Sequence, residues 1–203
     1  MASQKSKKTG KLFIISAPSG GGKTTITQEV IARLAGKYNI QRAINYTSRA
    51  PRDNEVNGID YYFITQEEFL EKKAAGFFLE TTRYDNNYYG SPISLIRDLA
   101  HGISFILTTD RPGAAVIKHR VPEAILIWIY VSNPHDIKQR LIQRSLTKSQ
   151  NIERRFILAQ QETEQELREN LFKYHIANDV LETAVQEVCN IIQEELNCDS
   201  SSR

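Results

Sequence analysis

The chain has 203 residues, of which 40% are hydrophobic, and its 26 basic and 24 acidic side chains nearly balance. This length suits one domain, or one domain with small inserted lobes, and the composition is that of an ordinary soluble globular protein. A net charge of only +2 does not indicate a general surface for polyanions, so no nucleic-acid partner is expected.

Cysteine use and the apolar runs indicate the setting. Cys189 and Cys198 lack metal-site spacing and are too few for a disulfide framework, so we expect a reducing, cytoplasmic environment. Residues 1–10 are polar and lack the apolar stretch of a signal peptide, which predicts a disordered tail. The longest apolar run, at residues 124–131, is too short to span a membrane, so no membrane partner is expected.

A strand-like run over residues 11–16 leads into a loop of small residues, and residues 24–34 follow with apolar side chains at helical spacing. The loop reads Ala17-Pro18-Ser19-Gly20-Gly21-Gly22-Lys23-Thr24-Thr25. This order predicts a Walker A loop, whose amides and helix N-terminus bind the phosphates of a nucleoside triphosphate. Lys23 is expected to reach the terminal phosphates and the Thr24 hydroxyl to hold Mg²⁺. The motif's first glycine is Ala17 here, which requires an ordinary turn.

The next part of the chain reads as a small inserted lobe at residues 45–91, with many aromatic residues and no long apolar run. We predict strands at residues 40–46, 61–64 and 77–80 and a capped helix at residues 65–75. Residues 81–91 are polar and rich in tyrosine.

The remainder alternates between strand and helix patterns. We predict strands at residues 103–107, 124–131 and 175–177 and helices at residues 92–100, 113–119, 133–144, 152–174 and from 179 onward. This alternation implies an α/β fold with a parallel sheet covered by helices on both faces. The Gly-rich loop then lies at the carboxyl edge of the sheet, where ligands bind.

A P-loop alone does not distinguish a GTPase, an ATPase motor and a small-molecule kinase. Residues 110–113 match the Asp-x-x-Gly of GTPases, but four residues are a weak signal and the chain has no Asn-Lys-x-Asp motif. An ATPase motor usually needs more chain and a strand that ends in an acid. The inserted lobe is the feature that decides between these classes.

Residues 47–63, from Thr47-Ser48-Arg49 to Tyr61-Tyr62-Phe63, resemble the guanylate kinase signature, as do Phe78-Leu79-Glu80 and Tyr89-Gly90-Ser91. With the P-loop, Asn178-Asp179 and the arginine-rich residues 140–155, the resemblance covers nearly all of the chain after residue 10. It implies a P-loop NTPase-type parallel sheet flanked by helices, with an inserted α+β lobe and a short helical lid. In that reading the core comprises residues 11–44, 92–131 and 156–203, the acceptor lobe residues 45–91, and the lid residues 132–155. The implied substrates are ATP and GMP, with Mg²⁺ as cofactor.

The acceptor residues also make chemical sense individually. Arg49 and Arg52 can form a two-fork clamp on one phosphate dianion, to which Tyr61 and Tyr89 offer hydroxyl donors, although such residues are often plain surface groups. The resemblance makes Glu80 the base reader, because a carboxylate accepts both adjacent N–H donors of guanine, whereas adenine presents a repelling acceptor. Rejection of this kind can reach ~10⁴-fold.

The resemblance also implies the rest of the site. The expected GMP contacts are Asn45, Arg49, Arg52, Tyr61, Glu80, Tyr89, Ser91 and Asp110; the expected ATP contacts are residues 17–25 and Asn178; the expected catalytic residues are Lys23, Arg49, Arg140, Arg144 and Arg155. Asn178 has a plain alternative role as a helix cap. Asn45 stands where the family has Ser, and Thr108 stands where it has the first Asp of Leu-Asp-x-Asp.

Three function hypotheses follow. The first is an ATP:GMP phosphotransferase of purine nucleotide metabolism, which would also accept dGMP. The second is a catalytically weakened guanylate-kinase-like binding module, although such modules typically lose the Gly-Lys-Thr that residues 22–24 keep here. The third is a nucleoside monophosphate kinase with an altered acceptor, motivated by Asn45 and Thr108. The oligomeric state is left open.

Overall fold

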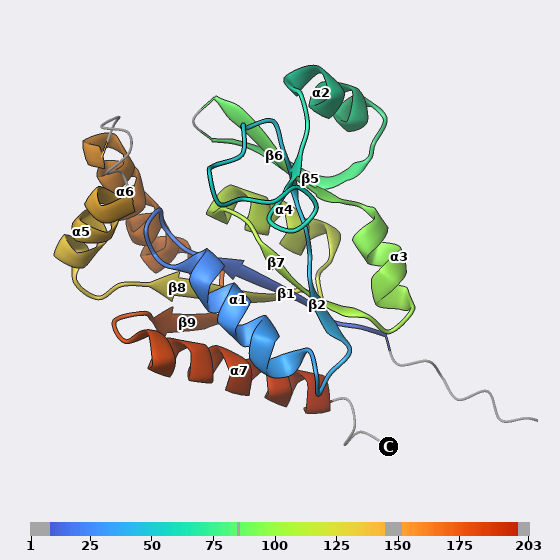
Figure 1. Ribbon diagram of the computed structural model, residues 1–203. Helices are drawn as coiled ribbons and strands as arrows, with labels where there is room; N and C mark the ends of the chain where they lie inside the picture. Colours follow the sequence, from blue (N-terminus) through green and yellow to red (C-terminus); the bar gives the residue numbers. More distant parts are fainter. Residues whose placement is uncertain (1–8, 85, 145–151, 199–203) are drawn as a thin grey trace, which may run out of the picture.

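The computed structural model describes residues 9–84, 86–144 and 152–198. A five-stranded sheet consists of β1 (Leu12–Ser16), β2 (Ile40–Arg42), β7 (Ser104–Thr108), β8 (Ile125–Tyr130) and β9 (Tyr174–Ala177). The strands are ordered β2-β7-β1-β8-β9 and every neighbouring pair is parallel, so the predicted α/β fold is confirmed (Figure 1).

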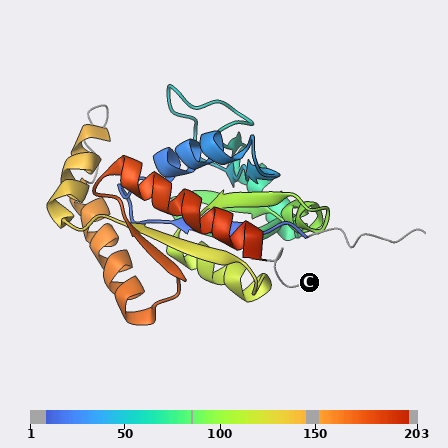
Figure 2. The same ribbon diagram turned by 90° about the horizontal axis from the view of Figure 1, so that it is seen from below.

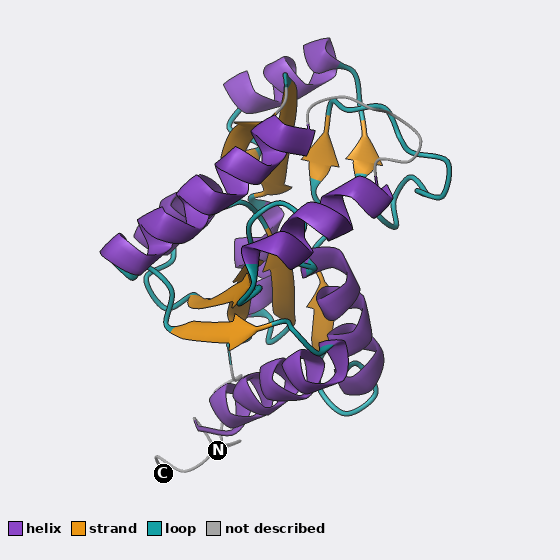
Figure 3. Cartoon of the chain, turned by 90° about the vertical axis from the view of Figure 1, so that its left-hand side faces the viewer, coloured by secondary structure: helices purple, strands orange, loops and turns teal. Residues whose placement is uncertain are grey.

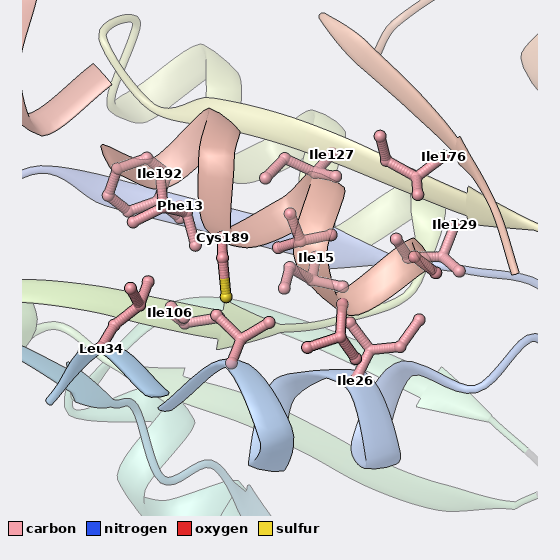
Figure 4. Close-up of a cluster of buried hydrophobic side chains, with 14 of the residues drawn as sticks. Phe13, Ile15, Ile26, Leu34, Ile106, Ile127, Ile129, Ile176, Cys189 and Ile192 are labelled. Atoms are coloured by element: carbon pink, nitrogen blue, oxygen red, sulfur yellow. The ribbon is translucent and has the colours of Figure 1, made fainter. Parts of the chain in front are cut away.

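Helices cover both faces of this sheet because its central strand is apolar on both sides, all five residues of β1 being buried. On one face, α1 (Lys23–Leu34) and α7 (Leu181–Cys198) lie side by side (Figure 2). Their apolar residues pack on Phe13 and Ile15 in the cluster that Figure 4 shows. On the other face, α3 (Ser94–Ala100) and α4 (Arg111–Arg120) pack on Leu12 and Ile14.

The second sheet lies above the first in Figure 1 and is inserted between β2 and β7. It has the strand order β4-β3-β6-β5, with strands β3 (Tyr46–Thr47), β4 (Tyr62–Phe63), β5 (Phe78–Tyr84) and β6 (Asn87–Pro92). The helix α2 (Gln66–Ala74) begins at a capping box between Thr65 and Glu68. Its Phe69 stacks on Phe78 with 4.5 Å between ring centroids, which joins α2 to the sheet.

Two further helices, α5 (Pro134–Arg144) and α6 (Ile152–Glu169), lie beside each other at the carboxyl edge of the large sheet (Figure 3). Ile137, Leu141 and Ala159 are buried where the two helices meet. Leu141 also faces Gly20 of the Gly-rich loop. Residues 145–151, part of the predicted lid, lie outside the described residues.

Several predicted elements differ in extent. Residues 40–46 do not form one strand, because the chain leaves the large sheet after Arg42 and joins the small one at Tyr46. Residues 81–91 belong to a β5–β6 hairpin whose turn contains Asn86 with φ 62°. Residues 81–91 are polar and tyrosine-rich and contain no apolar run, so apolar patterning did not reveal these strands.

The predicted start of one helix and the predicted end of another were also wrong. Pro92 ends β6 instead of opening a helix, and α3 begins at Ser94. The α6 helix stops at Glu169, because Asn170 takes a left-handed φ of 47°. Of the predicted tail, residues 1–8 lie outside the described residues, but the Gly10 N–H donates to the Leu99 carbonyl at 2.8 Å. None of the helices in the described ranges is long and apolar enough to cross a membrane.

Candidate active site

The predicted Walker A loop joins β1 to α1 with the backbone geometry of a phosphate-binding loop. Gly20 and Gly22 have φ of 89° and 99°, a left-handed conformation that favours glycine. The Gly21 N–H donates to the Pro18 carbonyl at 2.9 Å and closes a tight turn. Gly22 is the N-cap of α1, so the unpaired N–H groups of the first helical turn open at the loop. Ala17 has no positive φ, as the sequence predicted.

Asn178 and Lys23 fix the loop from inside. The buried Asn178 side chain donates from Nδ2 to the Gly21 carbonyl at 2.8 Å. A Cβ added at Gly22 would lie 2.3 Å from that same nitrogen, so the site requires glycine for space as well as for conformation. The Lys23 ammonium donates to the Ala17 carbonyl. Asn178 is therefore placed against the loop backbone, and it is not the cap of α7.

Of the predicted catalytic arginines, Arg155 reaches the same loop and Arg140 reaches Asn178, which holds it. The Arg155 guanidinium, on α6, donates to the Ser19 hydroxyl from Nη2 at 2.9 Å. Arg140, on α5, donates to the Asn178 carbonyl at 2.8 Å. Arg144 is the last residue of α5, and its side chain lies outside the described part of the chain.

The residues at the start of α1 fit a magnesium ion that is shared with nucleotide phosphates. Thr24 is exposed in the first turn and offers one hard oxygen donor, and Thr25 follows it half-buried. Among the described residues no group of three or more His, Cys, Asp or Glu side chains could form a dedicated metal cage. One protein oxygen, phosphate oxygens and water are a donor set that Mg²⁺ accepts.

In the small lobe, Arg49 is held by aromatic rings and by an acid. Its guanidinium lies 5.7 Å from the ring centroids of both Tyr61 and Phe63, and it bonds Glu55 at 2.9 Å. Arg52, more exposed, lies 3.8 Å from the same carboxylate. Burial alone would raise the pKa of Glu55, but the bonds from the two arginines outweigh it and the pKa is lowered. Both arginines therefore converge on one anionic group, as a phosphate clamp must.

The two predicted hydroxyl donors lie at this clamp. Tyr61 and Tyr89 make an edge-to-face contact with 6.1 Å between ring centroids. The Tyr89 hydroxyl also interacts with Arg49. Burial raises the pKa of Tyr61, so that phenol remains a protonated donor near neutral pH.

Glu80 lies in a buried polar pocket with Ser91 and Asn45. The Ser91 hydroxyl is 2.7 Å from Glu80 Oε1 and 3.1 Å from Asn45 Oδ1. Asn45 Nδ2 donates to the Thr108 carbonyl at 2.8 Å, which ties this pocket to the end of β7. Burial, with Asp110 as a nearby like charge, raises the pKa of Glu80 to about 7, against the lowering effects of Ser91 and Arg120.

Asp110 and Gly113 connect this pocket to the large sheet. Asp110 caps α4 by accepting from the Gly113 N–H at 2.9 Å. A Cβ added at Gly113 would lie 2.3 Å from Thr109 Oγ1, 3.0 Å from Asp110 Oδ1 and 3.1 Å from Glu80 Oε2. The two acids therefore approach each other over a position that only glycine fits. Sequence reasoning missed Gly113, although a glycine early in a predicted helix was a usable signal.

Sequence reasoning also missed three charged residues beside the site. Arg111 is buried and donates to Glu166 at 3.0 Å, and Glu162 lies within electrostatic reach of Lys23 and Asp110. Glu162 and Glu166 were on a predicted helix, where charged residues usually face solvent, and Arg111 lay just before another. Because β7 pairs with β1, the P-loop and Asp110 lie at the same sheet edge.

Comparisons with known proteins agree with this arrangement. A family model described as guanylate kinase matches residues 9–195. The chain is 35% identical over 188 residues to a guanylate kinase from Wolbachia sp. subsp. Brugia malayi, covering 92% of this chain and 93% of that protein. It is 38% identical over 188 residues to the guanylate kinase from Protochlamydia amoebophila, covering 91% of each.

A solved structure gives the same result for the fold. The crystal structure of guanylate kinase from Anaplasma phagocytophilum aligns with a TM-score of 0.76 at 26% identity, covering 93% of this chain and 87% of that one. The family model and the relatives cover nearly the whole chain, and the structure has a P-loop and an inserted lobe with a buried carboxyl. The chain therefore belongs to the guanylate kinase family.

Proposed function

We propose that this protein transfers the γ-phosphoryl group of ATP to GMP, and also to dGMP, giving ADP and the nucleoside diphosphate. The observation that carries the proposal is Glu80, a carboxyl 3% exposed whose Oε2 atom lacks a hydrogen-bond partner among the described residues. A buried acceptor of this kind is destabilising unless a ligand pairs with it. Guanine does so with its N1–H and exocyclic amine.

The donor site is the P-loop. Its amides and Lys23 bind the triphosphate, and Mg²⁺ at Thr24 supplies neutralisation of phosphate charge when bound. Asn178 acts on this site through Gly21, whose carbonyl it holds. Arg140 and Arg155 lie close enough to the loop to stabilise charge on the transferring group.

The acceptor site combines the phosphate clamp and the base pocket. Arg49 and Arg52 bind the GMP phosphate in place of Glu55, and Tyr61 and Tyr89 donate to it. In the base pocket Ser91 and Asn45 orient the Glu80 carboxylate, and Asp110 lies between the acceptor site and the P-loop. These contacts bring both nucleotides to one sheet edge, where phosphoryl transfer depends on alignment.

We assign residues 45–91 as the acceptor lobe and residues 132–155 as the lid over ATP. Closure of both parts would exclude water from the phosphoryl path. The free thiols of Cys189 and Cys198 support a cytoplasmic setting in purine nucleotide metabolism. No observation favours the weakened binding module, and Asn45, bonded into the base pocket, supports guanine as the acceptor base.

The test is ADP formation from ATP and Mg²⁺ with GMP, dGMP, AMP, CMP and UMP in parallel. Turnover with GMP and dGMP alone supports the proposal. Turnover with another acceptor only would contradict guanine specificity, and binding of ATP and GMP without turnover would contradict catalysis. A Glu80→Gln variant that kept full preference for GMP would remove Glu80 as the base reader.

A further inference from the structure

Helix α6 is anchored at both ends of the candidate active site. Near its start, Arg155 bonds the Ser19 hydroxyl of the P-loop at 2.9 Å. Near its end, Glu166 accepts from Arg111 at 3.0 Å, with both side chains less than 5% exposed. Arg111 directly follows Asp110, so α6 spans the distance between the P-loop and the acid at the end of β7.

Glu162 lies between these two anchors and on the same helix face. Residues 155, 159, 162 and 166 follow the i, i+4, i+7, i+11 spacing of one helix face, and Ala159 is fully buried. Ala159 is buried where α6 meets α5, so this face of α6 is turned toward the interior of the molecule. The anchors therefore fix where the Glu162 carboxyl lies, independently of its protonation.

The surroundings of Glu162 come from the P-loop, α1 and α4. The Ser19 N–H, Lys23 and Arg111 stabilise its negative charge, and Asp110 opposes it. Burial, the largest influence, raises the pKa of Glu162. In the proposed reaction Ser19 and Lys23 serve the nucleotide phosphates, so this carboxyl lies within electrostatic reach of the donor-binding groups.

We propose that Glu162 is a positioning residue for phosphoryl transfer, which orients the Lys23 ammonium and the Ser19 amide toward the phosphates of ATP. The inference rests on the proposed function. The end of β7 reads Thr108-Thr109-Asp110 and supplies one carboxylate, and Glu162 supplies a second from α6. The Lys23 ammonium is a point charge on a flexible four-carbon stem and donates to the Ala17 carbonyl in the structure, so a nearby carboxylate can set its direction.

The test compares kcat, the KM for GMP and the dissociation constant of Mg·ATP in wild type and Glu162→Gln. The amide keeps the size of the side chain but carries no charge to orient Lys23. We expect kcat to fall about 10- to 100-fold, as for misalignment of a reacting group, while the KM for GMP and the ATP dissociation constant stay within about threefold. Glu162→Asp, which keeps the charge on a shorter side chain, restores part of kcat.

Glu164→Gln, an exposed change on the same helix, is the matched control and leaves all three constants unchanged. A Glu162→Gln enzyme with wild-type kcat overturns the inference. So does a variant whose kcat falls only in proportion to a loss of folded protein, measured by thermal unfolding, since that marks a structural role. If wild type itself transfers no phosphoryl group to GMP, the proposed function fails first, which separates the two outcomes.

Discussion

The Oε1 atom of Glu80 lies 2.7 Å from the Ser91 hydroxyl, while its Oε2 atom, buried, faces no hydrogen-bond partner in the described residues. Ser91 has a single hydroxyl hydrogen but two close acceptors, the second being Asn45 Oδ1 at 3.1 Å. If Glu80 is protonated, both hydrogen bonds can form at once, because the acid donates to Ser91 and Ser91 donates to Asn45. Guanine, which brings two donors, requires the ionised form instead.

GMP binding is therefore predicted to release a proton. Because the pKa of Glu80 is raised to about 7, GMP affinity should be highest above pH 7 and fall roughly tenfold per pH unit below it. Calorimetric titration at pH 6 to 8, in buffers of different ionisation enthalpy, measures both effects. The phosphate of GMP also titrates, at pH ~6, and the Glu80→Gln variant measures the proton release that comes from this phosphate alone. Equal proton release by the variant and wild type would contradict the prediction.

The same pKa predicts how stability depends on pH. The folded-state pKa of Glu80 is raised from 4.5 to about 7, so between these values the folded state binds more protons than the unfolded state. Wild-type stability should therefore fall as pH rises through this window, by on the order of 3 kcal/mol from this group. Glu80→Gln carries no ionisable group here, so its advantage over wild type in urea unfolding should be larger at pH 8 than at pH 5. An equal difference at both pH values would exclude this effect.

The sequence predicted the parallel sheet and the P-loop because both have strong local signals. A buried parallel strand reads as a continuous apolar run, and the loop needs glycines next to Lys23 and Thr24. The β5–β6 hairpin has no such signal, since its aromatic residues pack on a helix from elsewhere in the lobe, such as Tyr88 on Phe69 of α2 at 5.4 Å between ring centroids.

For the candidate site, the sequence proposes residues but not the contacts between them. A family pattern can point to Glu80 and Asn178, but it cannot show that Asn178 bonds the Gly21 carbonyl or that a Cβ at Gly113 would touch Glu80. The buried pair of Arg111 and Glu166 was also invisible, because a helix charge normally faces solvent. Such contacts join residues far apart in sequence and depend on packing.

Gly113→Ala tests whether the base pocket and the cap of α4 share space. The new methyl group would meet Thr109, Asp110 and the Glu80 carboxyl within 2.3 to 3.1 Å, and helix propensity would otherwise favour Ala. We expect the KM for GMP to rise about tenfold or more through misplacement of Glu80, with the ATP dissociation constant unchanged. Steady-state kinetics with GMP varied, and calorimetry with ATP, check this. A variant with wild-type KM would mean that the pocket relaxes around the methyl group.

Arg111→Met tests the buried ion pair below the site. Removing the guanidinium leaves the Glu166 carboxyl, 1% exposed, with the Phe172 N–H and His175 Nε2, each at 3.0 Å, as its remaining partners in the described residues. We expect a loss of about 3–5 kcal/mol of unfolding free energy. Arg33→Met is the matched control: its pair with Glu182 is solvent-exposed, and we expect little change. Equal effects of the two substitutions in urea unfolding would contradict a special role for the buried pair.

Gly22→Ala and Gly36→Ala compare a glycine that the structure requires with one that it does not. At Gly22, φ is 99° and a Cβ would lie 2.3 Å from Asn178 Nδ2, so Ala must strain the loop and displace the side chain that holds Gly21. We expect a loss of about 1–2 kcal/mol of stability from the backbone alone and at least tenfold weaker ATP binding.

At Gly36 nothing lies within 4 Å and φ is not positive, so Ala should leave ATP binding unchanged and raise stability by about 0.4–1 kcal/mol. Unfolding curves and ATP titrations of both variants measure these effects. ATP binding by Gly22→Ala at wild-type affinity would show that the loop does not depend on its left-handed glycine or on the Asn178 contact.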